Sequence, residues 1–118
     1  MIVKYTKEPN PLACGQAVLA MLCGMSAEEI ISELSNDRET NLRTMRDCLA
    51  RHGITIGEKI RVTEKSDLPD IAVLSLETPK CWHWSLYFHG VFFDPEYGIL
   101  TDWPPSAARF YFEAKEVE

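Results

Sequence analysis

The hydrophobic residues of this chain change their spacing near Gly53, and this change limits the folds open to it. Before Gly53, apolar residues recur every three or four positions, as they do along one face of a helix. After Gly53, short apolar runs rich in β-branched and aromatic residues are separated by turn residues, a pattern typical of strands. Helices first and strands afterwards predict an α+β fold, with N-terminal helices packed on a C-terminal antiparallel sheet. At 118 residues, the chain is expected to form a single domain, 1–118.

Three helices are expected in the first half, after an extended entry segment (residues 1–13) that contains two prolines. The second helix carries a capping box, in which a serine and a glutamate three residues later cap each other's backbone. A glycine ends the first helix and the third. The first is expected from about Cys14 to Leu22, the second from Ser26, and the third from Thr40 or Asn41 to Gly53.

The second half is expected to contain a β-hairpin, CWHWSLYF and VFFDP, joined by the turn His89-Gly90. Alternate side chains of its first arm point to opposite faces. One face is apolar and expected in the core: Trp82, Trp84, Leu86 and Phe88. The other is expected to line a cleft: His83, Ser85 and Tyr87. The remaining strands are expected in ITI, KIRV, IAVLSL and ARFYFEAK.

The hairpin register places a histidine near a carboxylate. With a two-residue turn, Asp94 lies diagonally across from His83 on the same face, roughly 7–8 Å away between backbones. Side chains bridge that gap. An imidazole oriented by a carboxylate is the general-base part of a nucleophilic site. Glu96 and Asp102 are the alternative partners for His83.

Cys14 is the best-placed nucleophile for such a site. It stands at the start of an apolar helix, where unsatisfied N–H groups and the helix dipole favour a thiolate. Its own backbone N–H can donate to an oxyanion, and Gly15 is expected to let a substrate approach closely. The alternative is a buried structural thiol, because free cysteines are often buried.

The order Cys14, His83, Asp94 resembles that of papain-like cysteine peptidases. More specifically, the chain is similar to the double-glycine (bacteriocin-leader-processing) peptidases in CGQAVLAML, TNLRTMRDCLARHGI, HWSLYF and VFFDPEYG, which together span about residues 8–98. The resemblance implies a papain-like fold and a cysteine-nucleophile hydrolase that cleaves a peptide or amide bond through a Cys14-His83-Asp94 triad. It also suggests a substrate with a Gly-Gly leader.

One position departs from that family. Its members usually carry a glutamine six residues before the cysteine, and the glutamine amide completes the oxyanion hole together with the cysteine N–H. Here that position is Glu8, and an ionised carboxylate donates no hydrogen bond. Asn10 and Gln16 are the alternative amide donors. The alternative function is therefore a catalytically impaired module of the same fold that binds a peptide or partner protein in the cleft.

Composition limits the other partners. A net charge of −6 without a cluster of lysines and arginines argues against nucleic acid, so a peptide or protein substrate is expected. The chain contains no apolar run of signal-peptide or membrane-spanning length, so a cytoplasmic protein without a membrane partner is expected. Its four cysteines are then expected as reduced thiols. The sequence does not indicate the oligomeric state.

No metal or organic cofactor is expected, because the thiol supplies the chemistry. Cys23 and Cys48 are expected in the core or at helix ends, and His52 as a cation at a helix C-terminus. A zinc site that Cys81 and His83 would share with another cysteine is the weak alternative, because no paired CxxC or HxxxH spacing accompanies it.

Overall fold

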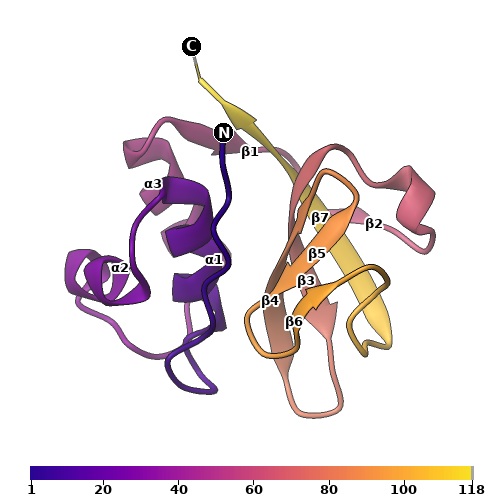
Figure 1. The fold of residues 1–118 in the computed structure, drawn as a ribbon, viewed down its shortest axis with the longest axis horizontal. Helices are drawn as coiled ribbons and strands as arrows, with labels where there is room; N and C mark the ends of the chain where they lie inside the picture. Colours follow the sequence, from indigo (N-terminus) through magenta and orange to yellow (C-terminus); the bar gives the residue numbers. More distant parts are fainter. Residues whose placement is uncertain (118) are drawn as a thin grey trace.

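Three helices form one layer of the molecule and an antiparallel sheet forms the other (Figure 1). The computed structural model describes residues 1–117. The predicted α+β class, with N-terminal helices packed on a C-terminal antiparallel sheet, is confirmed. The helices are α1 (Cys14–Cys23), α2 (Ala27–Leu34) and α3 (Leu42–Arg51). Within residues 1–117, no helix is long and apolar enough to cross a bilayer.

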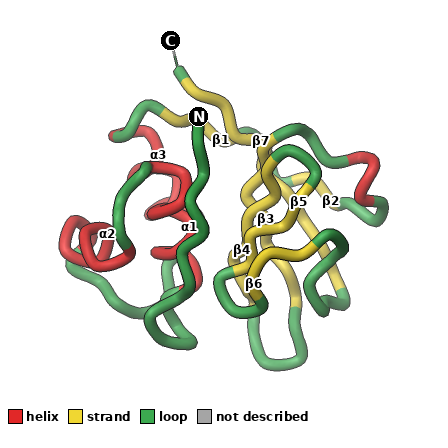
Figure 2. The backbone as a smooth tube through the Cα atoms, in the orientation of Figure 1, coloured by secondary structure: helices red, strands yellow, loops and turns green. Residues whose placement is uncertain are grey.

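The sheet has seven strands in the order β1-β7-β3-β4-β5-β6, and β2 pairs separately with β7 (Figure 2). The strands are β1 (Ile54–Ile56), β2 (Ile60–Arg61), β3 (Ile71–Glu77), β4 (Trp82–Phe88), β5 (Val91–Asp94), β6 (Gly98–Leu100) and β7 (Ala108–Glu116). The sequence pattern did not predict β6 or the short 3-10 helix Lys65–Asp67. The predicted strand KIRV shortens to the two residues of β2.

Local capping chemistry sets the helix boundaries. The capping box at α2 is confirmed: the Glu29 N–H donates to Ser26 Oγ at 3.0 Å, and the Ser26 N–H donates to the Glu29 carboxylate at 2.9 Å. At α3 the Thr44 N–H donates to Asn41 Oδ1 at 2.8 Å. Gly24 ends α1 in the left-handed conformation, with φ of 69°. These caps fix where α2 and α3 begin and where α1 ends.

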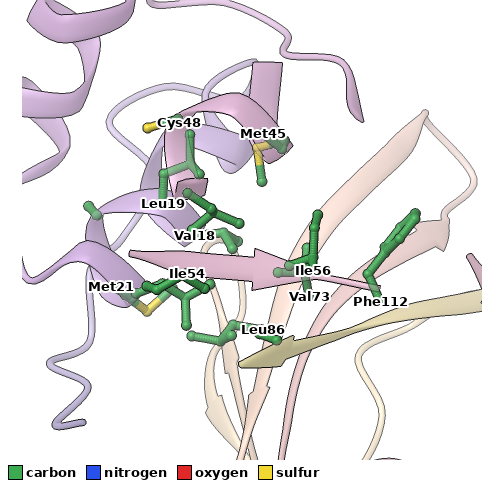
Figure 3. Packing of buried hydrophobic residues seen from close by; sticks show 14 of the residues in the cluster. Val18, Leu19, Met21, Met45, Cys48, Ile54, Ile56, Val73, Leu86 and Phe112 are labelled. Atoms are coloured by element: carbon green, nitrogen blue, oxygen red, sulfur yellow. The ribbon is translucent and has the colours of Figure 1, made fainter. Parts of the chain in front are cut away.

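The main core lies between the helices and one face of the sheet. Figure 3 shows side chains from α1, α3 and the strands that meet there, including Val18, Met45, Leu86 and Phe112. A second apolar cluster covers the opposite face of the sheet, around Phe92. Because both faces of the sheet carry buried residues, the polar side chains of β4 are enclosed rather than exposed in an open cleft.

The expectation that Trp82 belongs to the core is wrong. Its side chain is 52% exposed, because β4 begins there, at the edge of the helical layer. Its ring packs instead against Phe110 of β7, with the Lys59 ammonium 5.4 Å from the ring centroid. The next residue of β4, His83, is buried. The polar face of the strand therefore becomes enclosed one residue after Trp82.

Candidate active site

Cys14 occupies the first position of α1 and faces the start of β4. The N-cap residue is Ala13, whose methyl group cannot accept from the first-turn N–H groups. The Trp84 backbone N–H donates to Cys14 Sγ at 3.4 Å. The thiol therefore lies at the positive end of the α1 helix dipole, beside a backbone N–H donor of β4. Only 7% of Cys14 is exposed.

The β4–β5 hairpin delivers His83 and Asp94 to this thiol. The predicted register is confirmed: Phe88 pairs with Val91 and Leu86 with Phe93. The turn residues His89 and Gly90 have φ of 48° and 89°, the positive values that a two-residue hairpin turn requires. As predicted, Asp94 reaches diagonally across to His83. Its two carboxylate oxygens each lie 3.1 Å from His83 Nε2.

Asp94 is held by further donors and is fully buried. Its carboxylate accepts from Ser85 Oγ at 2.7 Å and from the Glu96 and Tyr97 N–H groups at 2.9 Å each. Burial opposes ionisation, but the hydrogen bond and positive charge of His83, then the Tyr97 N–H and Ser85, hold the pKa of Asp94 below its usual value. Asp94, rather than the alternative Glu96, is the carboxylate that orients His83.

His83 is held between a carboxylate and a thiol. Burial disfavours its cation. The hydrogen bond to Asp94, the hydrogen bond to Cys14 and the charges of both partners outweigh burial and raise the pKa of His83 to about 10. The raised pKa of His83 favours its imidazolium form at neutral pH. A cation beside a thiol stabilises the thiolate, which is the nucleophilic form of cysteine.

Glu8 lies beside this group on the extended N-terminal segment, which runs along α1 at the boundary with the sheet (Figure 1). The Glu8 N–H donates to the Pro95 carbonyl at 3.0 Å, and the Tyr5 hydroxyl donates to the Asp94 carbonyl at 2.6 Å. Glu8 Oε1 is buried and has no hydrogen-bond partner within residues 1–117. Burial is the main cause that raises the pKa of Glu8; His83 lowers it, and two nearby acids raise it further.

Neither alternative amide donor is available to the site. Asn10 Nδ2 donates to the Asp37 carbonyl at 3.0 Å, and Asn10 Oδ1 accepts from the Leu12 N–H. Gln16 is fully buried, and its amide donates to the Asn36 and Arg38 carbonyls at 2.8 Å each. Both amides therefore brace the loop between α2 and α3. Glu8 is the side chain that approaches the triad.

Gly15 serves helix packing, which corrects the expectation that it makes room for substrate. A Cβ on Gly15 would lie 2.1 Å from Thr40 Oγ1, and 3.2 Å from both Met45 Sδ and Trp84 Cδ1. Thr40 Oγ1 is itself buried. The absence of a side chain at Gly15 therefore lets the first turn of α1 approach the entry to α3 and strand β4.

Substituting Gly15→Ala is expected to lower the free energy of unfolding by about 1–3 kcal/mol, because the added methyl overpacks this contact. Urea denaturation measures the change. Gly57→Ala is the matched control, since the nearest atom to its Cβ is the Glu113 carbonyl at 3.9 Å. A Gly15→Ala protein about 1 kcal/mol more stable than wild type, as helix propensity alone gives, contradicts the packing role.

Cys23, Cys48 and His52, which sequence reasoning treated separately, come together outside the candidate active site. Cys23 ends α1, Cys48 is fully buried on α3 and His52 caps the C-terminus of α3, each as expected. The structure also brings the three together, and the exposed Cys81 is not among them. The four-residue spacing of Cys48 and His52 on one helix was the signal available in the sequence.

Searches with protein-family models and against curated proteins find no match to this chain. The geometry of Cys14, His83, Asp94 and Glu8 is therefore the basis on which a function can be proposed.

Proposed function

We propose that this protein is a papain-like cysteine hydrolase that cleaves a peptide or amide bond. The observation that carries the proposal is the alignment of three buried side chains. The Asp94 carboxylate bonds His83 Nε2 at 3.1 Å, and the thiol of Cys14, at a helix N-terminus, accepts at 3.4 Å from the backbone N–H of Trp84, the residue next to His83. A nucleophile, a general base and an orienting carboxylate recur in this arrangement on unrelated folds.

In the proposed reaction, Cys14 Sγ attacks the carbonyl carbon, and the carbonyl π electrons move to the oxygen. The Cys14 N–H donates to that oxyanion. As the C–N bond breaks, the His83 imidazolium gives its proton to the leaving amine, which leaves a thioester on Cys14. His83 then takes a proton from water, the resulting hydroxide attacks the thioester, and the C–S bond breaks to regenerate the thiolate and release the acid.

Glu8 supplies the second oxyanion donor only when it is protonated. A neutral carboxyl group carries one O–H donor, as a glutamine amide carries N–H donors, whereas a carboxylate only accepts. Because Oε1 of Glu8 is buried without a partner, a bound oxyanion would satisfy it in the neutral state. We therefore expect the rate of amide-bond hydrolysis to fall as Glu8 ionises.

The proposed substrate has small residues on both sides of the scissile bond. Cys14 and His83 are 7% and 4% exposed, so side chains beside the reacting carbonyl have little room. A Gly-Gly pair in an extended peptide requires the least space. The mechanism needs no metal or organic cofactor for the chemical step. It requires a reduced thiol, so we place the protein in the cytoplasm.

Alkylation by iodoacetamide tests the activated thiol. Steric access alone favours the exposed Cys81, whereas the proposed ion pair with His83 favours the nearly buried Cys14. We expect Cys14 to be labelled at least about tenfold faster than Cys81 at pH 7, as followed by peptide mass spectrometry. His83→Ala should remove this preference. Labelling of Cys81 before Cys14 in the folded wild type contradicts the proposal.

The second candidate function is a binding module without catalysis, which the carboxylate of Glu8 favours. A Gly-Gly peptide with a fluorogenic amine after the second glycine separates the two. The hydrolase releases the amine between pH 4 and 8 and loses that release in Cys14→Ala, although the variant still binds the peptide. A wild type that binds the peptide, releases no amine anywhere in that range and labels its cysteines by exposure alone is the binding module.

A further inference from the structure

A second cluster of reactive side chains lies at the end of α1 remote from Cys14. Cys23 is the last residue of α1, and Cys48 and His52 lie one turn apart at the C-terminal end of α3. The two Sγ atoms and a ring nitrogen of His52 all lie within 4.8 Å of one another. Two thiols and an imidazole from two helices therefore converge on one point.

A carboxylate from α2 lies beside the cluster. Glu33 of α2 places Oε2 3.5 Å from Cys48 Sγ and Oε1 2.8 Å from His52 Nε2. The Arg51 guanidinium donates to Oε2 at 3.1 and 3.3 Å. Each of the three helices thus contributes at least one side chain, and the Arg51 guanidinium binds the Glu33 carboxylate.

We propose that Cys23, Cys48 and His52 bind a zinc ion, with Glu33 as the fourth ligand. Two sulfurs, one imidazole nitrogen and one carboxylate oxygen are ligands that zinc takes tetrahedrally. Bond lengths of about 2.0–2.3 Å place neighbouring ligand atoms roughly 3.3–3.8 Å apart in such a site. The ligand atoms of Cys23, Cys48 and His52 therefore need shifts on the order of 1 Å to reach that geometry from their present spacing, and the Glu33 carboxylate, which lies outside the 4.8 Å group, must move farther.

Charge and access also favour this ligand set. Binding releases the two thiol protons to solvent, and two thiolates with the Glu33 carboxylate exceed the charge of Zn²⁺ by one. Arg51, already bonded to that carboxylate, offsets the excess. The side chains of His52 and Glu33 are each 26% exposed, which gives an ion a route from solvent, while Cys48 is buried.

The zinc site does not rest on the proposed hydrolase function. Cys14 and Cys23 stand at opposite ends of α1, about 14 Å apart along the helix axis. The ion would join the ends of three helices and so stabilise the helical layer. A disulfide between Cys23 and Cys48 would use the two sulfurs, and the His52 imidazole and the Glu33 carboxylate would then only pair with each other.

Metal titration of the reduced full-length chain tests the proposal. Cys14→Ala serves as the background, so that the thiol and imidazole of the candidate active site cannot compete for the ion. We expect one Zn²⁺ per chain in competition with a chromophoric chelator. Co²⁺ should give thiolate-to-metal charge-transfer bands and the visible bands of a tetrahedral ion. Zn²⁺ should also raise the unfolding temperature.

Matched variants assign the ligands. In the Cys14→Ala background, His52→Ala should weaken zinc binding by about 100-fold or more and Glu33→Gln by about tenfold, whereas Cys81→Ser should leave it unchanged. His52→Ala changes a partly exposed side chain, and circular dichroism checks that it folds. A folded, reduced Cys14→Ala chain without stoichiometric zinc or thiolate–cobalt bands overturns the proposal. A Cys23–Cys48 disulfide in protein purified anaerobically with a reductant also overturns it.

Discussion

Replacing Glu8 by glutamine is expected to raise the rate of amide cleavage at neutral pH by about 100-fold or more, the usual contribution of one oxyanion-hole donor. The reason lies in the protonation of one carboxyl group. Glu8 approaches the triad with Oε1 buried and unpartnered, and as an anion it would repel the charge that develops on the substrate oxygen. A glutamine amide donates at every pH. The measurement is kcat/KM for the fluorogenic Gly-Gly peptide in both proteins.

The pH profile separates this explanation from a general improvement of the site. Burial raises the pKa of Glu8, His83 lowers it, Glu96 and Asp94 raise it, and Lys7 lowers it. The neutral form therefore persists to a higher pH than in a free glutamate. Wild-type activity should be greatest on the acid side of that pKa and fall as pH rises through it. Glu8→Gln should abolish this fall, because the amide does not titrate.

A matched control uses the neighbouring acid. Glu96→Gln removes one charge that raises the pKa of Glu8, so the fall in activity should move to lower pH without a gain in the maximal rate. If Glu8→Gln is as slow as wild type at every pH although Cys14 remains reactive to iodoacetamide, then Glu8 does not reach the oxyanion. The activated thiol and the oxyanion donor are thus tested separately.

The pairing of His83 with Asp94 was predictable from sequence because it depends on short-range rules. A two-residue turn at His89-Gly90 fixes the hairpin register, and strand alternation then decides which side chains share a face. The same applies to the helix boundaries, where the residues that form the caps are three positions apart. Because such local geometry has a fixed period, it leaves few alternative hairpin registers or helix boundaries.

The residues whose surroundings the sequence did not predict correctly depend on packing between distant segments. Trp82 has the alternation of a core residue, but the extent of the helical layer leaves it half exposed. The sequence suggested that Gly15 faces the substrate. In the structure it packs against Thr40, which lies 25 positions later in the chain. Gln16 binds carbonyls of a loop whose path no local pattern fixes. The meeting of Cys23 with Cys48 likewise follows from how α1 and α3 pack.

Substituting Asp94→Ala is expected to lower the free energy of unfolding by about 3–5 kcal/mol near pH 5.5, because it leaves a buried cation without its partner. His83 is 4% exposed and Asp94 is fully buried, so water cannot replace the lost interaction at the ring. Urea denaturation of the wild type and of Asp94→Ala, both kept reduced, measures the loss while retaining Cys14, whose hydrogen bond and charge also raise the pKa of His83.

The pH dependence of that loss identifies its cause. The pKa of His83 is raised from 6.5 to about 10, so the stability it contributes is complete below pH 6.5 and disappears as pH rises through 10. The pKa of Asp94 is lowered from 3.8, so its contribution is complete above pH 3.8 and disappears as pH falls through its native value. The loss should be largest between these limits.

The variant Asp94→Asn tests the charge alone, because its side chain can still accept from the Glu96 and Tyr97 N–H groups. A loss in Asp94→Ala that does not change with pH, and that Asp94→Asn avoids, means that Asp94 acts through the turn rather than through His83.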